Sequence, residues 1–93
     1  MPSEIDIEFD PVKNLSNLEK HGVSLEHAAD FEWETAQIDE DLRFVYAEKR
    51  FRATGRLGER LHVLVFCKRG DATRVISLRT ANEREAKSYA NSD

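Results

Sequence analysis

The sequence predicts an α+β fold in which an N-terminal strand and a helix pair pack on an antiparallel β-sheet, with a C-terminal helix. Three observations support this prediction. Apolar residues alternate with polar ones in several short runs, they recur every three positions near the N-terminus, and glycine-containing turns separate the runs of the second half. The 93 residues allow one modest hydrophobic core, so residues 1–93 are expected to form a single domain.

The first expected elements are a strand and a helix. The strand is marked by apolar residues that alternate with acidic ones, namely Ile5, Ile7 and Phe9. Asp10 can cap the free N–H groups of a helix that starts at Pro11 and runs to about His21. The apolar positions of this helix, which predict the face that it buries, are Val12, Leu15 and Leu18.

The end of this helix contains two cations with a structural explanation of their own. Lys20 and His21 precede Gly22, which can adopt the left-handed conformation that closes a helix. Cations in a last turn also complement the negative end of the helix dipole. Ser24 offers the next N-cap, so a second helix is expected directly after it, ending around residues 31–33.

The second half reads as strands followed by a helix. Three strands are expected at residues 51–56, 61–66 and 73–78; residues 36–39 are ambiguous and can form a fourth strand, with Tyr46 before a polar turn that follows them. Residues 61–66 are apolar on both faces, which is typical of a central strand. Asn82 and Glu85 form a capping-box pattern that predicts the last helix. We expect the helices on one face of the sheet and the other face open to water or a ligand.

The charge of the chain is divided between its halves. Residues 1–48 hold thirteen acidic and three basic side chains, a balance of −10, whereas residues 49–93 hold five and eleven, a balance of +6. Nine of these eleven cations lie between Lys49 and Arg79, over the expected sheet. A positive sheet can bind phosphates, while the acidic half can dock a basic segment of a partner protein. The alternative is that the two halves neutralise each other within the fold.

Several classes of protein are disfavoured. No apolar run reaches membrane-spanning length and the N-terminus lacks signal-peptide features, so a cytoplasmic protein is expected. Cys67 is the only cysteine, and its place in an apolar run predicts a small buried side chain rather than a nucleophile. The three histidines show no recognised metal spacing, so no metal or cofactor is expected.

Arginines and histidines without paired acids on the sheet favour phosphoryl transfer on RNA. In that reaction guanidinium forks stabilise a phosphorane, and histidine or lysine moves protons. Arg50 and Arg52 share one strand face, but regular alternation places Arg74 and Arg79 on opposite faces. These two can join one site only if the strand twists or ends before Arg79. His62 is in phase with apolar residues, so a core histidine bonded to a backbone carbonyl is the alternative there.

Three stretches resemble the BrnT family: FDPVKNLSNLEKHGVSLEHA, RFRATGRLGERLHVLVF and RVISLRTANEREAKSY. They cover the chain from about Ile7 to Tyr89. The resemblance implies a single toxin domain with a RelE/ParE-like fold. It also implies a ribonuclease toxin of a type II toxin–antitoxin system, which cleaves cellular RNA without a metal or cofactor and thereby inhibits translation.

The resemblance also implies a site and partners. By motif, the catalytic candidates are Lys20, His21, Arg50, Arg74, Arg79 and Tyr89, and further basic residues expected to bind RNA are Arg52, His62, Lys68 and Arg69. The implied partner is a BrnA-type antitoxin encoded nearby, through which the toxin meets operator DNA only indirectly, within a hetero-oligomer that can contain a toxin dimer. The alternative is a non-catalytic RelE/ParE-like module that inhibits a protein target or acts in a repressor complex.

Overall fold

The computed structural model describes residues 6–43, 45 and 47–91. The strands are β1 (Asp6–Phe9), β2 (Gln37–Glu40), β3 (Phe51–Leu57), β4 (Arg60–Arg69) and β5 (Ala72–Thr80). The helices are α1 (Pro11–His21), the 3₁₀ segments η1 (Leu25–Asp30) and η2 (Trp33–Thr35), and α2 (Glu83–Asn91). The predicted α+β fold is confirmed. Two of the sequence expectations, for Ile5 and Tyr46, lie outside the described residues.

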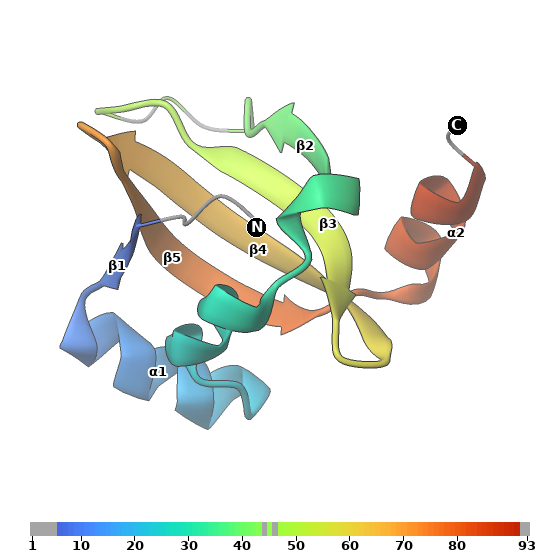
Figure 1. Ribbon diagram of the computed structural model, residues 1–93, viewed down its shortest axis with the longest axis horizontal. Helices are drawn as coiled ribbons and strands as arrows, with labels where there is room; N and C mark the ends of the chain where they lie inside the picture. The colour runs from blue at the N-terminus through green and yellow to red at the C-terminus, as the bar shows by residue number, and fades with distance from the viewer. Residues whose placement is uncertain (1–5, 44, 46, 92–93) are drawn as a thin grey trace.

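One five-stranded sheet, in the order β1-β5-β4-β3-β2, organises the molecule (Figure 1). Strands β2 to β5 form the expected antiparallel meander, with β4 in its interior. The N-terminal strand β1 pairs in parallel with β5, so the first and the last strand of the chain are neighbours. The sequence predicted β1 but not its partner. None of the helices in the described part of the chain is both long and apolar enough to cross a membrane.

The hydrophobic core lies between one face of the sheet and the segment η1. The sheet contributes Ala53, Leu64, Phe66, Val75 and Leu78 to this core. Leu25 and Ala28 of η1, together with Phe31 directly after it, cover these residues, and the three are spaced by three residues. Side chains three apart align on one side of a 3₁₀ helix, which has three residues per turn. This alignment explains why the expected second helix forms as 3₁₀ turns.

Helix α1 has the predicted bounds but presents the opposite face to the sheet. The Oδ1 atom of Asp10 accepts a hydrogen bond from the Val12 N–H (2.9 Å), and Gly22, at φ 72°, closes the helix by donating to the Leu18 carbonyl. The apolar stripe that was expected to be buried is exposed: Val12 by 72%, Leu15 by 68% and Leu18 by 46%. The expectation for this stripe was wrong, because polar side chains attach the helix to the sheet.

Asn17 is the main attachment. Strand β1 pairs with β5 only as far as Val75, which leaves the following edge of β5 without a neighbouring strand. The Asn17 Nδ2 atom donates to the Leu78 carbonyl at 2.7 Å, and its Oδ1 accepts from the Leu78 N–H at 3.1 Å. One side-chain amide therefore replaces a strand residue at this edge. On the same side of α1, Asn14 Oδ1 accepts from the Leu25 N–H at 2.7 Å.

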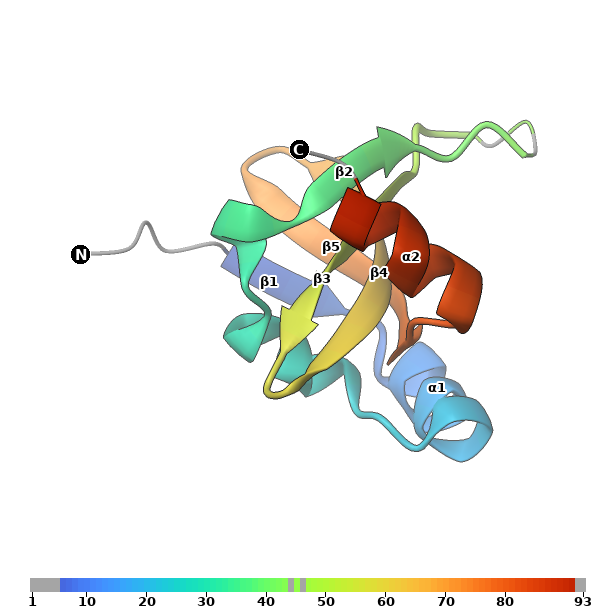
Figure 2. The ribbon, with the colours of Figure 1, turned by 90° about the vertical axis from the view of Figure 1, so that its right-hand side faces the viewer.

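Helix α2 lies on the other side of the sheet from η1 and packs near β3 and β5 (Figure 2). The expectation that all helices share one face was wrong for this helix. Its cap explains the difference. The Asn82 N–H donates to Glu85 Oε1 (2.9 Å) and the Glu85 N–H donates to Asn82 Oδ1 (2.8 Å), which confirms the predicted capping box. Glu85 also binds an arginine of β5, and this contact draws the helix over the second face.

We predict that Asn17→Leu destabilises the protein by about 2–4 kcal/mol. The substitution keeps the side-chain volume similar but leaves the N–H and carbonyl of Leu78 without partners, and each buried orphan costs about 1–3 kcal/mol. Urea unfolding at neutral pH measures the free energy, with Ser16→Ala, an exposed position on the same helix, as the control. A loss below about 0.5 kcal/mol would contradict the role given to Asn17.

Candidate functional site

A β-bulge brings two distant arginines onto one face of the sheet. The pairs between β4 and β5 are Val63–Arg79, Val65–Ser77 and Cys67–Arg74, with a register shift between Val65 and Phe66. Directly opposed residues of an antiparallel pair share a face, and alternate residues of β4 point the same way. The extra residue in β5, Ile76, therefore changes the parity of the strand. Arg74 and Arg79 share a face although their separation in sequence is odd.

A third arginine joins them from β3. Arg52 pairs with Val65, so it lies on the same face as Arg74 and Arg79. We call this side of the sheet the arginine face, defined by Arg52, Arg74 and Arg79. Arg50 lies immediately before β3, where its carbonyl accepts a hydrogen bond from the Asp41 N–H at 2.7 Å. The face is opposite the one that η1 covers.

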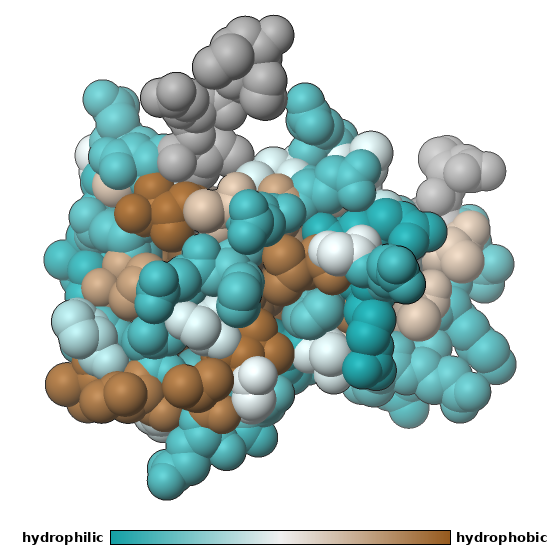
Figure 3. Space-filling model, turned by 60° about the horizontal axis from the view of Figure 1, so that its bottom comes forward, coloured by the Kyte–Doolittle hydropathy of each residue, from teal (hydrophilic) through white to brown (hydrophobic). Residues whose placement is uncertain are grey.

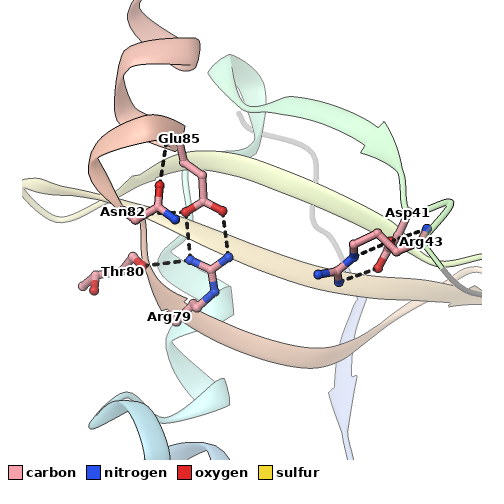
Figure 4. A network of polar contacts seen from close by, with 6 residues as sticks. All are labelled: Asp41, Arg43, Arg79, Thr80, Asn82 and Glu85. Atoms are coloured by element: carbon pink, nitrogen blue, oxygen red, sulfur yellow. Dashed lines mark hydrogen bonds and ion pairs between the residues drawn. The ribbon is translucent and has the colours of Figure 1, made fainter.

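Arg79 is held in a fork by Glu85 (Figure 4). Its Nη1 donates to Glu85 Oε1 at 2.8 Å and to the Thr80 carbonyl at 3.2 Å, and its Nη2 donates to Glu85 Oε2 at 2.7 Å. These bonds use three of the five N–H donors that a guanidinium carries. The guanidinium is thus fixed in position and keeps donors for a further acceptor.

The pair also changes the acidity of both partners. The hydrogen bonds from Arg79 lower the pKa of Glu85 from 4.5 to about 2, against the effect of burial; the Asn82 N–H and the charge of Arg52 add to the lowering. The Glu85 carboxylate in turn raises the pKa of Arg79, while burial and the neighbouring Arg43 oppose the rise. Both groups are therefore charged at neutral pH, which suits Glu85 to positioning an arginine rather than to carrying a proton.

Arg43 is a cation near the site that the sequence did not indicate. It follows β2, and its Nε and Nη2 atoms bind both carboxylate oxygens of the buried Asp41 at 2.9 Å (Figure 4). It is close enough to Arg79 to affect the pKa of that side chain. The signal in the sequence is the pattern Asp41-Leu42-Arg43, in which a carboxylate can bind an arginine two residues later. That pattern is too common to identify a site alone.

Lys20 and His21 lie beside the arginine face. A hollow of about 180 Å³ lies between α1 and β5. It is lined by Lys13, Ser16, Asn17, Lys20, His21, Ile76 and Ser77. Ser77 belongs to the arginine face, because it pairs with Val65. Both Lys20 and His21 are exposed. Helix α1 and strand β5 therefore meet beside Ser77.

Tyr89 belongs to α2 and lies at another border of this face. A second hollow, of about 380 Å³, is lined by Gln37, Asp39, Arg52, Thr54, Asn82, Arg84, Glu85, Ser88 and Tyr89. The Tyr89 hydroxyl donates to the Thr35 carbonyl at 3.1 Å, and Gln37 Nε2 donates to the Tyr89 carbonyl at 3.4 Å. These bonds anchor α2 to the edge of the sheet at β2. Arg52 and Glu85 connect the hollow with Arg79.

Two of the expected RNA-binding residues lie on the core side of the sheet and are not part of the arginine face. His62 is only 6% exposed, lies on the core face, and its Nδ1 is 3.0 Å from the Arg60 carbonyl, which favours the core-histidine interpretation. Lys68 also points to the core side, where its Nζ donates to Thr73 Oγ1 at 3.2 Å. Arg69 has the parity of Val65 and Cys67, so it lies on the side of the arginine face, but at the hairpin end of β4 and 3.7 Å from Glu48. Of these four candidates, Arg52 and Arg69 therefore share the side of Arg74 and Arg79.

The remaining expectations concern thiol, metal and charge. Cys67 is buried as expected, and burial followed by its hydrogen bond to Glu48 raises the pKa of its thiol. The described residues contain no group of three or more His, Cys, Asp or Glu side chains arranged to hold a metal ion. Exposed acidic side chains of the first half are spread over η1, η2 and β2, namely Glu26, Asp30, Glu34, Asp39 and Glu40. Docking of a basic segment there stays a prediction.

Comparison with known proteins gives two findings. Residues 9–85 match the model of a family described as "Ribonuclease toxin, BrnT, of type II toxin-antitoxin system". The chain is also similar to the crystal structure of the Brucella abortus ribonuclease toxin BrnT, with 25% sequence identity and a TM-score of 0.68. This similarity covers 85% of the chain and 99% of the Brucella protein. A search of curated protein sequences finds no significant match.

We predict that the ion pair between Arg79 and Glu85 makes stability depend on pH below about 4.5. Because folding lowers the pKa of Glu85 from 4.5 to about 2, the pair stabilises the fold fully above the unfolded value and loses this effect as the pH falls towards 2. Glu85→Gln is a sharp comparison, since glutamine retains a capping box but not the charge. Urea unfolding between pH 7 and 2.5 should show the stability difference between the two proteins shrinking with acid. A constant difference would contradict this prediction.

Proposed function

Because the chain belongs to the BrnT family of ribonuclease toxins of type II toxin–antitoxin systems, we propose that it is a metal-independent endoribonuclease that cleaves cellular RNA and inhibits translation. An antitoxin partner goes with this family. The specific partner in the proposal is a BrnA-type antitoxin encoded nearby, and the site of action is the cytoplasm.

The β-bulge in β5 is the observation that carries the proposal. It places Arg74 and Arg79 on one face with Arg52, although regular alternation would separate them. Planar guanidinium groups match phosphate oxygens in a bidentate way, and several of them on one surface suit an RNA backbone. Lys20 and His21 border the same face at Ser77. Cations suited to binding phosphate therefore lie on the same face of the sheet that side chains suited to proton transfer border.

The proposed reaction is attack of a ribose 2′-hydroxyl on the adjacent phosphorus, with departure of the 5′ oxygen. Arg79 is the first candidate for stabilising the charge of the phosphorane, because Glu85 holds its guanidinium rigidly while leaving donors for the phosphate. Arg52 and Arg74 would bind flanking phosphate oxygens. His21 is the candidate for proton transfer, since histidine is the side chain best suited to that task near neutral pH. Lys20, Arg50 and Tyr89 complete the proposed site.

One observation favours a second function. Arg74 binds Glu8 at 3.0 Å and Arg79 binds Glu85 at 2.7 Å, so each cation is already neutralised by a carboxylate. Ion pairs of this kind can serve the fold alone, and the protein would then inhibit a protein target or act in a repressor complex without cutting RNA. Incubation of the purified protein with RNA separates the two functions.

The mechanism predicts RNA products with a 2′,3′-cyclic phosphate or 3′-phosphate and a 5′-hydroxyl, formed equally well in the presence of EDTA. Attack by the 2′-hydroxyl gives the 2′,3′-cyclic phosphate and the 5′-hydroxyl without water, and hydrolysis of the cyclic phosphate by one water molecule then gives the 3′-phosphate. Incubation with total RNA, with and without chelator, followed by mapping of the new ends, checks both points. Loss of cleavage in EDTA with recovery on adding Mg²⁺ would exclude this mechanism.

Arg79→Ala should lower the cleavage rate by about 10²–10³, because loss of one donor to a developing oxyanion has a cost of this order. Arg79→Lys should recover little of it, since an ammonium group cannot form the bidentate fork. Single-turnover cleavage of a defined RNA measures the rate, and circular dichroism checks the fold. Lys68→Ala is the matched control, because that cation lies on the core side of the sheet. Equal rates for Arg79→Ala and the unmodified protein would remove Arg79 from the site.

His21→Ala distinguishes chemistry from helix capping. As a proton-transfer group, His21 should lower cleavage by about 10²–10⁴ when removed, with a nearly unchanged melting temperature. As a helix-end residue alone, it should cost at most about 1 kcal/mol of stability and leave the rate unchanged. Gly22→Ala is the structural control, because a Cβ is strained at φ 72° and should destabilise by about 1 kcal/mol without a comparable loss of rate. Full activity of His21→Ala would restrict His21 to the structural role.

A further inference from the structure

The hollow of about 380 Å³ between α2 and the strands β2 and β3 has a fixed shape (Figure 2). Its volume is within the range of roughly 300–1,000 Å³ that is usual for small-molecule sites. Two hydrogen bonds attach one end of α2 to the edge of the sheet, from the Tyr89 hydroxyl to the Thr35 carbonyl and from Gln37 to the Tyr89 carbonyl. At the other end, Glu85 binds Arg79 at 2.7 Å. Because α2 is attached at both ends, the hollow exists before any ligand arrives.

Three charged side chains that line this hollow do not pair with one another. They are Asp39 of β2, Arg52 of β3 and Arg84 of α2. Asp39 and Arg52 are directly opposed on paired strands, so both leave the sheet on the arginine face. In the described part of the chain, none of the three side chains makes a hydrogen bond or an ion pair. A carboxylate and two cations around one space are therefore available to a ligand that offers both donors and acceptors.

The rest of the lining is polar and includes one aromatic ring, that of Tyr89. Figure 3 shows that apolar surface gathers over α1, whereas the side of the molecule on which α2 lies is largely hydrophilic. An apolar partner surface does not match such a lining. A flat ring with hydrogen-bonding groups along its edge matches it, and RNA bases are recognised in this way, by hydrogen bonds to their edges and by stacking on aromatic side chains.

The charged groups discriminate among the four bases. The two oxygens of a carboxylate accept hydrogen bonds, and guanine presents two adjacent donors to them, its N1–H and its 2-amino group. Adenine and cytosine present one amino group beside an acceptor nitrogen, which a carboxylate repels, and uracil presents a single N–H between two carbonyls. An arginine fork, in turn, matches the O6 and N7 acceptors of guanine.

We propose that this hollow binds a guanine base of the RNA substrate. Asp39 accepts hydrogen bonds from N1–H and the 2-amino group, and Arg84, from the opposite wall, donates to O6 and N7. The proposal deepens the proposed ribonuclease function and rests on it for RNA as the source of the base.

The position of the hollow suits a nucleotide next to the cleaved phosphate. Arg52 lines the hollow and belongs to the arginine face, so a phosphate bound on that face can have its base in the hollow. Glu85 also lines the hollow and holds Arg79, the candidate for stabilising the phosphorane. Asp39 contacts the base and none of the reacting atoms, so its role is to determine specificity.

The test measures the affinity of the purified protein for short RNAs that differ in a single base, by fluorescence anisotropy. Their riboses carry 2′-O-methyl groups, which cannot attack the phosphorus, so binding is measured apart from cleavage. Guanine should bind about 5- to 150-fold more tightly than each other base, the discrimination that a good bidentate contact gives. Inosine, which differs from guanine only by lacking the 2-amino group, should lose part of this preference.

Asp39→Asn should remove the difference between guanine and inosine, because an amide offers one acceptor instead of two. Arg84→Ala should remove the difference between guanine and 7-deazaguanine, which lacks the N7 acceptor. Asp71→Asn is the matched control: Asp71 is exposed in the turn between β4 and β5, outside the hollow, and its substitution should keep the full guanine preference. Melting temperatures check that the variants are folded.

Equal affinity of the unmodified protein for all four bases would overturn the proposal, as would failure to bind any of these RNAs or a full guanine preference in Asp39→Asn. Free GMP tests the other source of guanine: GMP that binds more tightly than the guanine-containing RNA would assign the hollow to a free nucleotide and overturn the proposal. Absence of cleavage of ordinary RNA would refute the proposed function instead, because the base preference is measured on RNA that cannot be cleaved.

Discussion

The two hydrogen bonds between the Asn17 amide and the backbone of Leu78 are the constraint on which the arrangement of this protein depends. Strand β1 is too short to cover the whole edge of β5, so the exposed edge needs a partner, and a side-chain amide has one donor and one acceptor in the required geometry. Once Asn17 occupies that edge, the rotation of α1 is fixed. The end of the helix, with Lys20 and His21, then lies beside Ser77, and the apolar side of the helix faces outwards. The candidate site and the exposed apolar stripe are two sides of one helix, set by one polar contact.

The second constraint is the parity of β5. In a regular strand, the side chains of Arg74 and Arg79 would point to different faces of the sheet, and one of them would enter the core. The extra residue at Ile76 allows Val75 and Leu78 to remain in the core while both arginines leave it. Glu85 then links this strand to α2, because the same carboxylate caps the helix and binds Arg79. Loss of Glu85 therefore affects the start of a helix and the position of a guanidinium together, which is why a glutamine at this position separates the two effects.

Sequence reasoning succeeded where the signal is local. The caps at Asp10 and Asn82 and the helix end at Gly22 follow from side chains and backbone conformations within three residues of each other, and they formed as predicted. It failed where a distant backbone decides. The periodicity of Val12, Leu15 and Leu18 is real, but the burial of α1 is determined by an unpaired edge some sixty residues further along the chain. Likewise, no local pattern announces the bulge at Ile76 or the parallel pairing of β1 with β5, since both depend on how whole strands align. The sequence identified the candidate cations by residue type. Which of them share one face of the sheet depends on the strand register, which the sequence did not reveal.

The ion pairs of the arginine face bear on how such a surface can act on RNA. Arg74 and Arg79 are each bound to a carboxylate, which orients the guanidinium groups before any phosphate arrives and limits the mutual repulsion of the cations. Glu85 remains ionised because its pKa is near 2, so the fork persists over the whole physiological pH range. In the proposed mechanism, a phosphate shares Arg79 with Glu85 through the remaining donors rather than replacing it, and the nearby positive charge of Arg43 offsets part of the repulsion between the two anions. In this mechanism, an RNA chain that reaches Arg79 in this way also passes the hollow beside Lys20.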